Sequence, residues 1–169
     1  LKKIKKVLNK SFIQAVDLIL NCKGKVICAG IGKSGLIARK ISATFSSVGI
    51  PSFFCDPAQA LHGDMGQIEK RDLLIIFSYS GNTTELTNML KYANRFRIKI
   101  IGVASKSNSL LLKASDVKLL LPKVKESDVT GMVPTSSTSI TLLLGDCLAT
   151  TILSKRKFSK EKFKIFHPG

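Results

Sequence analysis

The chain has 169 residues, of which 44% are hydrophobic and 22% charged, a balance typical of a globular domain with one buried core. No apolar run reaches the roughly 18 residues that span a membrane, and polar residues interrupt any N-terminal signal sequence. We therefore expect one cytoplasmic domain over residues 1–169, without a membrane partner.

The net charge of +16 is high, and many of the lysines lie near the two ends of the chain. Such a basic surface can bind nucleic acid or anionic lipid. Neither an aromatic-rich RNA-binding motif nor a helix-turn-helix accompanies the lysines. We therefore expect a solvated basic surface that helps to gather small anions, and no nucleic-acid partner.

The hydrophobic periodicity predicts helices and strands that alternate along the chain. Apolar residues recur at three- and four-residue steps at the start, which predicts an N-terminal amphipathic helix over residues 1–24. In chain order, strands are predicted over residues 25–29, 51–55, 73–78, 98–104 and 117–121, and further helices over residues 36–48, 82–96, 109–114 and 135–153. Between them lie a polar loop or short helix at 56–64 and an irregular segment at 122–134, and a charged tail covers residues 155–169.

This alternation predicts an α/β fold, a three-layer α-β-α sandwich around a mainly five-stranded parallel sheet of the flavodoxin or Rossmann type. The helix over residues 135–153 is apolar almost all round, which indicates burial in the core or in an oligomer interface. Ligands of such sheets bind at the carboxyl ends of the strands.

The four cysteines are far apart, without a C-x-x-C pair, and the chain has two histidines. This spacing does not provide a cluster of metal ligands. Cys28 and Cys55 lie in apolar strand-like runs, so we expect buried thiols rather than nucleophiles. We expect neither a metal nor a cofactor.

Two loops follow predicted strands at the ligand-binding edge of the sheet. Residues 30–35 read GIGKSG, and residues 78–85 read SYSGNTTE. Each joins a strand to a helix, so backbone N–H groups and the positive end of a helix face one spot. Two such loops, rich in hydroxyls and carrying Lys33, predict a binding site for a small phosphorylated anion.

The first loop, taken alone, has other interpretations. It fits the dinucleotide pattern G-x-G-x-x-G, with Asp56 near the end of the second strand as the ribose-binding acid. This interpretation gives the second loop no role. A Walker A motif is rejected because Ile27 stands where that motif needs glycine. A tight turn without function is the remaining alternative.

The motifs together closely resemble the sugar isomerase (SIS) domain, and within it the D-arabinose-5-phosphate isomerase subgroup. They are GIGKSG at 30–35, ATF at 43–45, PSFF at 51–54, HGD at 62–64, SxSGxxxE at 78–85, PTSST at 134–138, GD at 145–146 and HPG at 167–169. The SxSGxxxE loop marks the superfamily, whereas HGD and HPG narrow the resemblance to the isomerase subgroup.

The resemblance implies a site that interconverts D-ribulose 5-phosphate and D-arabinose 5-phosphate without a cofactor, in the route to 3-deoxy-D-manno-octulosonate and lipopolysaccharide. It implies a homotetramer whose active sites are shared between subunits and reached by the tail at 155–169. The implied catalytic residues are Lys33, His62, Glu85 and His167, and the implied phosphate-binding residues are Gly32, Ser34, Ser78, Ser80, Thr83, Ser136 and Thr138. Among the catalytic residues, Glu85 is the candidate base.

Several of these residues also have plain structural interpretations. Glu85 could be a capping-box glutamate that binds the backbone of Asn82 at the start of a helix. Ser136 and Thr138 could be ordinary N-cap residues. Lys33 could be a phosphate-binding or surface lysine, and a lone histidine such as His62 is more often structural.

The sequence also departs from the family pattern. Tyr79 and Asn82 stand where the family usually carries a smaller polar residue and an acid, and residues 127–130 replace a stretch that usually contains Cys-Pro. Many relatives continue into a pair of regulatory CBS-type domains, which we do not expect in this chain. The departures leave a sugar-phosphate-sensing domain without catalysis as the alternative function, followed by a dinucleotide-binding oxidoreductase.

Overall fold

The computed structural model describes residues 2–157, 159, 161, 164 and 166–167. Its centre is one sheet of five parallel strands in the order β2-β1-β3-β4-β5. The strands are β1 (Val26–Gly30), β2 (Ser52–Cys55), β3 (Leu73–Phe77), β4 (Lys99–Ala104) and β5 (Val117–Leu120). The predicted α/β fold and parallel sheet are confirmed, and every strand lies within a residue or two of its predicted bounds.

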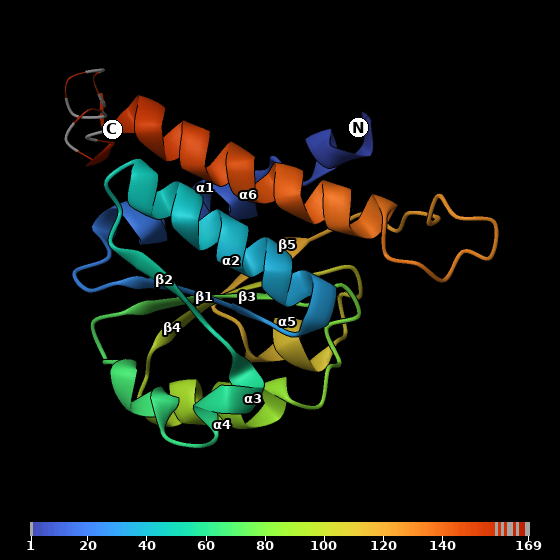
Figure 1. Ribbon diagram of the computed structural model, residues 1–169, viewed down its shortest axis with the longest axis horizontal. Coiled ribbons are helices and arrows are strands. Elements are labelled where there is room, and N and C mark those ends of the chain that lie inside the picture. The colour runs from blue at the N-terminus through green and yellow to red at the C-terminus, as the bar shows by residue number, and fades with distance from the viewer. Residues whose placement is uncertain (1, 158, 160, 162–163, 165, 168–169) are drawn as a thin grey trace.

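Helices cover both faces of the sheet (Figure 1). One layer contains α1 (Lys10–Asn21), α2 (Gly32–Ser47) and α6 (Ser136–Lys155). The other contains α3 (Pro57–Ala60), α4 (Leu86–Arg95) and α5 (Leu110–Ala114), with a 3-10 helix η2 (Asp64–Gln67) after α3. The strand order reverses between β1 and β3, and in such sheets this switch point is where ligands bind.

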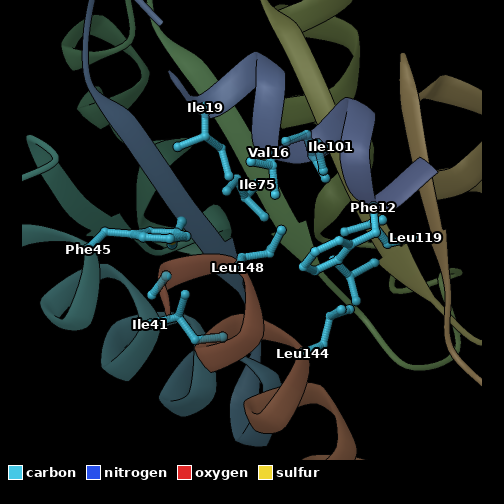
Figure 2. Close-up of a cluster of buried hydrophobic side chains, with 14 of the residues drawn as sticks. Phe12, Val16, Ile19, Ile41, Phe45, Ile75, Ile101, Leu119, Leu144 and Leu148 are labelled. Atoms are coloured by element: carbon cyan, nitrogen blue, oxygen red, sulfur yellow. The ribbon is translucent and has the colours of Figure 1, made fainter. Parts of the chain in front are cut away.

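The larger apolar cluster lies between the sheet and the layer of α1, α2 and α6 (Figure 2). Side chains of all three helices converge there on Ile75, Ile101 and Leu119 of the sheet. The helices α2 and α6 approach closely, since a Cβ atom on Gly145 would lie 2.2 Å from the Ile41 side chain. This contact lies near the middle of both helices, which run side by side over the sheet (Figure 1).

The apolar character of α6 follows from this packing. With 20 residues and a mean hydropathy of 1.3, α6 is long and apolar enough to span a membrane by length and composition alone. The helix instead packs against α1 and α2, and Leu144, Leu148 and Ile152 are buried. Its hydrophobicity is therefore that of a core helix, as one of the two sequence interpretations expected.

The N-terminal segment differs from the single predicted helix. A 3-10 helix η1 (Lys2–Lys6) precedes α1, and the Asn9 side chain caps α1 by accepting a hydrogen bond from Ser11 N at 2.9 Å. Ile4 and Val7 are nevertheless buried with α1. The apolar spacing predicted the burial of Ile4, Phe12, Ala15 and Ile19, but Leu8 is exposed and Val7 is buried in its place, because the capping asparagine divides the segment into two helices.

Candidate functional site

The first loop carries β1 directly into α2. Gly32 is the first residue of α2, and the first helical hydrogen bond runs from Gly35 N to Ile31 O over 3.3 Å. Lys33 is exposed and Ser34 half-buried. The loop therefore presents a cationic side chain and a hydroxyl beside the positive end of a 16-residue helix.

Many polar groups of the second loop, residues 78–85, form hydrogen bonds with one another. The Ser78 hydroxyl accepts a hydrogen bond from Gly81 N at 3.1 Å and lies 2.8 Å from the Thr83 hydroxyl. Gly81 has φ +69°, and a Cβ atom on it would lie 2.3 Å from Ser109 Oγ. The tight turn therefore requires glycine, because a side chain would be strained and would collide with Ser109. Ser80, at the tip of the turn, is exposed.

A third segment reaches the same edge from the other side. Residues 121–135 connect β5 to α6, and the Glu126 carboxylate lies over the start of α6. Its Oε2 accepts hydrogen bonds from Thr135 N at 2.9 Å, Ser137 N at 3.1 Å and the Thr135 hydroxyl at 3.2 Å. Desolvation alone would raise the pKa of Glu126, but hydrogen bonds from Ser137 and Thr135 outweigh it and lower the pKa to about 2.

These three segments enclose a cavity of about 330 Å³. It is lined by Ile31, Lys33, Ser34, Ile37, Tyr79, Ser80, Glu126, Pro134, Ser137, Thr138 and Thr141. Lys33 contributes the one cation and Glu126 the one carboxylate among these lining residues. The cavity thus combines a positive group, a negative group and several hydroxyls at the switch point of the sheet. This arrangement can anchor a small polyhydroxylated anion and move a proton on it.

The cavity contains four of the residues predicted for the site. Lys33 and Ser34 come from the first loop, Ser80 from the second, and Thr138 from the first turn of α6. The remaining predicted residues do not line it: Gly32, His62, Ser78, Thr83, Glu85, Ser136 and His167. Their roles stay predictions, and four of them require comment.

Glu85 does not have the predicted capping-box geometry. The helix α4 begins at Leu86, four residues later than predicted, so Glu85 is the N-cap residue and its side chain makes no cap bond. The Glu85 carboxylate instead accepts a hydrogen bond from the Thr84 hydroxyl at 3.2 Å, and Asn82 N donates to Ser80 Oγ. The Glu85 side chain is exposed.

Ser136 and Thr138 are not N-cap residues either. The N-cap residue of α6 is Thr135, which makes no side-chain cap bond of its own. Glu126, nine residues earlier, takes over the capping by accepting from Thr135 N and Ser137 N. Capping is therefore supplied here by tertiary structure rather than by the helix's own sequence.

The two histidines lie away from the cavity. His62 is exposed in the turn between α3 and η2, where its backbone N–H donates to Gln59 O. His167 is exposed and follows α6, whose 20 residues cover about 30 Å from the cavity to the opposite end of the layer. That end is fixed by Arg156, whose Nη1 donates to Gly49 O at 2.8 Å, just beyond α2 (Figure 1).

The predicted reach of the tail into an active site falls partly on residues 158, 160, 162–163, 165 and 168–169, which lie outside the described residues.

The described residues do not support a metal site, a dinucleotide site or a cysteine nucleophile. Among the described residues, no group of three or more His, Cys, Asp or Glu side chains could hold a metal ion. The Asp56 carboxylate caps α3, accepting from Ala58 N at 2.9 Å, so the ribose-binding acid of the dinucleotide interpretation is already bonded. Cys28 and Cys55 are buried as expected, and desolvation raises the pKa of Cys28 to about 12.

Comparison with known families decides between these interpretations. The model of the SIS domain matches residues 19–151 of the chain. The chain belongs to the SIS domain family.

Sequence relatives of this SIS chain include proteins named as isomerases. Arabinose 5-phosphate isomerase KpsF of Escherichia coli O6:H1 is 44% identical over 170 residues, which cover 100% of this chain and 52% of that protein. Uncharacterized protein RP505 of Rickettsia prowazekii is 47% identical over 158 residues, which cover 94% of this chain and 49% of that protein. The chain thus spans about half the length of the curated relatives it matches.

Solved structures include a similar SIS protein with a bound sugar phosphate. The Escherichia coli CFT073 protein c3406, in complex with arabinose 5-phosphate, superimposes with a TM-score of 0.92 at 34% identity. The match covers 99% of this chain and 90% of that one. The strand order and layers described above are therefore those of an SIS fold that holds a sugar phosphate in that protein.

Seven of the residues that line the SIS cavity were not predicted for the site, and Glu126, Ser137 and Tyr79 show why. Glu126 lies in the segment predicted as irregular, and its partner amides begin nine residues later, a spacing that matches no local capping pattern. Ser137 lies between Ser136 and Thr138, the two residues of this segment that the family resemblance implies for the site. Tyr79 departs from the family pattern, and this departure is the one signal in the sequence that points to the residue.

Proposed function

We propose that this SIS chain is an aldose–ketose isomerase that interconverts D-ribulose 5-phosphate and D-arabinose 5-phosphate. The observation that carries the proposal is the cavity at the β1/β3 switch point, with Lys33, Glu126 and the hydroxyls of Ser34, Ser80 and Thr138. Relatives named arabinose 5-phosphate isomerase share 40–44% of its residues over the whole chain, and a similar structure was solved with arabinose 5-phosphate bound. The product would feed 3-deoxy-D-manno-octulosonate and lipopolysaccharide synthesis from the cytoplasm.

The reaction moves a proton between two adjacent carbons of the open-chain sugar through an enediol. A base removes the proton from one carbon and returns it to the other, while a cationic group stabilises the negative charge that develops on oxygen. Lys33 is the cation available for this task at the cavity wall. The hydroxyls of Ser34, Ser80 and Thr138, with the amides at the start of α2, would anchor the phosphate. Gly32, Ser78, Thr83 and Ser136 would support these donors from behind the cavity wall.

Two carboxylates compete for the role of base. Glu85 is favoured by the family resemblance, although its exposed side chain lies outside the cavity lining of a single chain. Glu126 is favoured by geometry, because its Oε2 takes all three described hydrogen bonds of the carboxylate and the carboxylate borders the cavity. Both residues belong to the proposal, Glu85 as the base and Glu126 as a fixed negative group that orients the substrate, because its pKa of about 2 keeps it ionised near neutral pH.

A kinetic comparison separates the two. In D₂O, each turnover should exchange the abstracted proton, so deuterium at C2 of arabinose 5-phosphate measures proton abstraction directly. Glu85→Gln should abolish both turnover and exchange, whereas Glu126→Gln should slow turnover. Full exchange in Glu85→Gln would remove Glu85 as base, and absence of any conversion by the wild-type chain would overturn the isomerase proposal.

The remaining residues require a second subunit. His167 lies twelve residues beyond α6, whose far end is about 30 Å from the cavity, so we propose that it serves a neighbouring cavity. The exposed Val129, Met132 and Val133 on the β5–α6 segment and the half-buried Leu142 and Leu143 on α6 offer apolar surface for subunit contacts. We therefore propose a homotetramer with shared active sites, in which His62 and His167 assist ring opening and proton transfer between the sugar oxygens.

Subunit mixing tests this arrangement. Lys33→Ala and His167→Ala chains should each be inactive alone, and should regain part of the activity after mixing and exchange of subunits. A monomer by light scattering, or mixtures that stay inactive, would contradict shared sites.

One observation favours a second function. With Glu85 outside the cavity and Tyr79 filling one wall, the chain could bind a sugar phosphate without converting it. Calorimetric binding of arabinose 5-phosphate without deuterium exchange would favour this sensing role.

A further inference from the structure

The Tyr79 side chain spans two of the three segments that build the cavity. Tyr79 lies in the second loop between Ser78 and Ser80, and its ring packs against the larger apolar cluster and lines the cavity. Its hydroxyl reaches the segment after β5, where it donates to Pro122 O at 3.3 Å and accepts from Val124 N at 2.9 Å. One hydroxyl therefore holds a main-chain carbonyl and a main-chain amide of the same short segment.

Tyr79 is itself firmly held. Its carbonyl oxygen accepts hydrogen bonds from Ser105 N at 2.9 Å and Ser105 Oγ at 2.7 Å, at the end of β4. The tyrosine is thus anchored to the sheet at its backbone and extends a fixed side chain outward. Tyr79 therefore fixes the position of residues 122–124, which its hydroxyl binds, relative to the sheet.

The segment that Tyr79 holds carries Glu126. The chain leaves the sheet after Leu121, whose N–H donates to Ala104 O at 2.8 Å. Glu126 lies two residues beyond Val124, and its carboxylate then binds the first turn of α6. Glu126 is therefore fixed between two points, the Tyr79 hydroxyl on its N-terminal side and the amides of Thr135 and Ser137 beyond it.

We propose that Tyr79 is a positioning residue, which braces residues 122–124 so that the Glu126 carboxylate lies at the cavity wall. The catalytic consequence rests on the proposed isomerase function, whereas the brace itself is a property of the fold. A smaller polar side chain, as the family resemblance expects at this position, is too short to make both hydrogen bonds. The chain uses a tyrosine hydroxyl at the place where its loop departs from the family pattern.

Amide hydrogen exchange by NMR tests the brace without any assay of activity. In Tyr79→Phe the Val124 amide loses its acceptor, so its exchange should accelerate about tenfold, as expected for one lost hydrogen bond. The amides of Thr135 and Ser137 should also exchange faster, because Glu126 is released. The matched control is Tyr92→Phe, which removes a hydroxyl that donates to Ile68 O at 3.3 Å in the other helix layer. Unchanged exchange at Val124 in Tyr79→Phe would overturn the proposal.

Steady-state kinetics test the link to Glu126. Tyr79→Phe should lower kcat about tenfold with KM within about twofold, and its effect should disappear in the Glu126→Gln background, since coupled residues are not additive. The same tenfold loss in both backgrounds, or a rise in KM alone, would overturn the positioning role. If the wild-type chain converts no sugar phosphate, the isomerase proposal fails while the exchange experiment still decides the brace.

Discussion

The two glycine- and serine-rich loops look alike in sequence but differ in how they use their polar groups. The loop at 30–35 leaves Lys33 and Ser34 facing the cavity, whereas the loop at 78–85 binds its own hydroxyls together through Ser78 and Thr83. Of the second loop, Tyr79 and Ser80 line the cavity. A hydroxyl-rich loop can therefore be a structural turn over most of its length, and free donors matter more than the number of serines.

The largest effect on activity is expected in the loop at 30–35, whose Lys33 and Ser34 face the cavity. Lys33→Ala should lower kcat/KM by about 100-fold or more, because it removes the cation that stabilises developing negative charge. The fold should be unaffected, since Lys33 is exposed. The measurement is conversion of ribulose 5-phosphate, with Lys91→Ala on the exposed face of α4 as the control. A similar loss in both variants would indicate that overall positive charge, rather than the loop, is responsible.

Substitutions in the loop at 78–85 should instead lower the free energy of unfolding. Gly81→Ala should destabilise the fold by at least about 2 kcal/mol, through the positive φ and the collision with Ser109. The melting temperature should fall by about 5 °C or more. Gly66→Ala is the matched control, because a Cβ atom there meets nothing within 4 Å. Equal melting temperatures for the two variants would argue against the tight turn.

Ser78 and Ser80 of the second loop should show different effects, because the Ser78 hydroxyl stabilises the loop whereas Ser80 lines the cavity. Ser78→Ala should cost about 1–2 kcal/mol in unfolding free energy, because the Thr83 hydroxyl loses its partner and the Gly81 amide keeps only its bond to Ser78 O. Ser80→Ala should leave stability within about 0.5 kcal/mol and raise KM several-fold. Urea unfolding and steady-state kinetics check the pair. The reverse pattern would place Ser78, not Ser80, against the ligand.

The smallest effect is expected for Glu126, in the segment at 121–135, and concerns how stability depends on pH. Hydrogen bonds hold the pKa of Glu126 at about 2, below its ordinary 4.5, so its contribution to stability is complete above pH 4.5. That contribution falls as the pH drops toward 2. The urea midpoint of the wild type should therefore exceed that of Glu126→Gln at pH 6, and the gap should narrow by pH 3. Glu85→Gln, which loses one Thr84 contact, is the control. A gap independent of pH would contradict this linkage.

The sequence predicted the fold well because buried strands and amphipathic helices leave strong periodic signals. The strand bounds, the apolar α6 and the position of the first loop follow from such local patterns. The start of α4 could not be predicted in this way, since Asn82 looks like the N-cap of a capping box. In the fold its Oδ1 accepts from Leu110 N at 2.9 Å, a partner 28 residues away.

The site was predictable in part for the same reason. Lys33 and Ser34 lie in the first turn of α2, directly after β1, so their place at the carboxyl edge of the sheet follows from the local sequence. Glu126 reaches the cavity only because β5 and α6 bring a distant segment there. Its contacts, like those of Tyr79, depend on tertiary structure, and a pattern of neighbouring residues does not contain that information.

The Glu126 carboxylate gives the cavity a polarity. Two helices begin there, α2 and α6, and each offers a partial positive charge. The bonds from Thr135 and Ser137 to Glu126 neutralise the end of α6 and leave that of α2 beside Lys33. The negatively charged end of a molecule with a neutral, hydroxyl-bearing chain would be attracted to the start of α2 and Lys33, and repelled by the Glu126 carboxylate. The fixed Glu126 carboxylate would thus favour one orientation of such a molecule in the cavity.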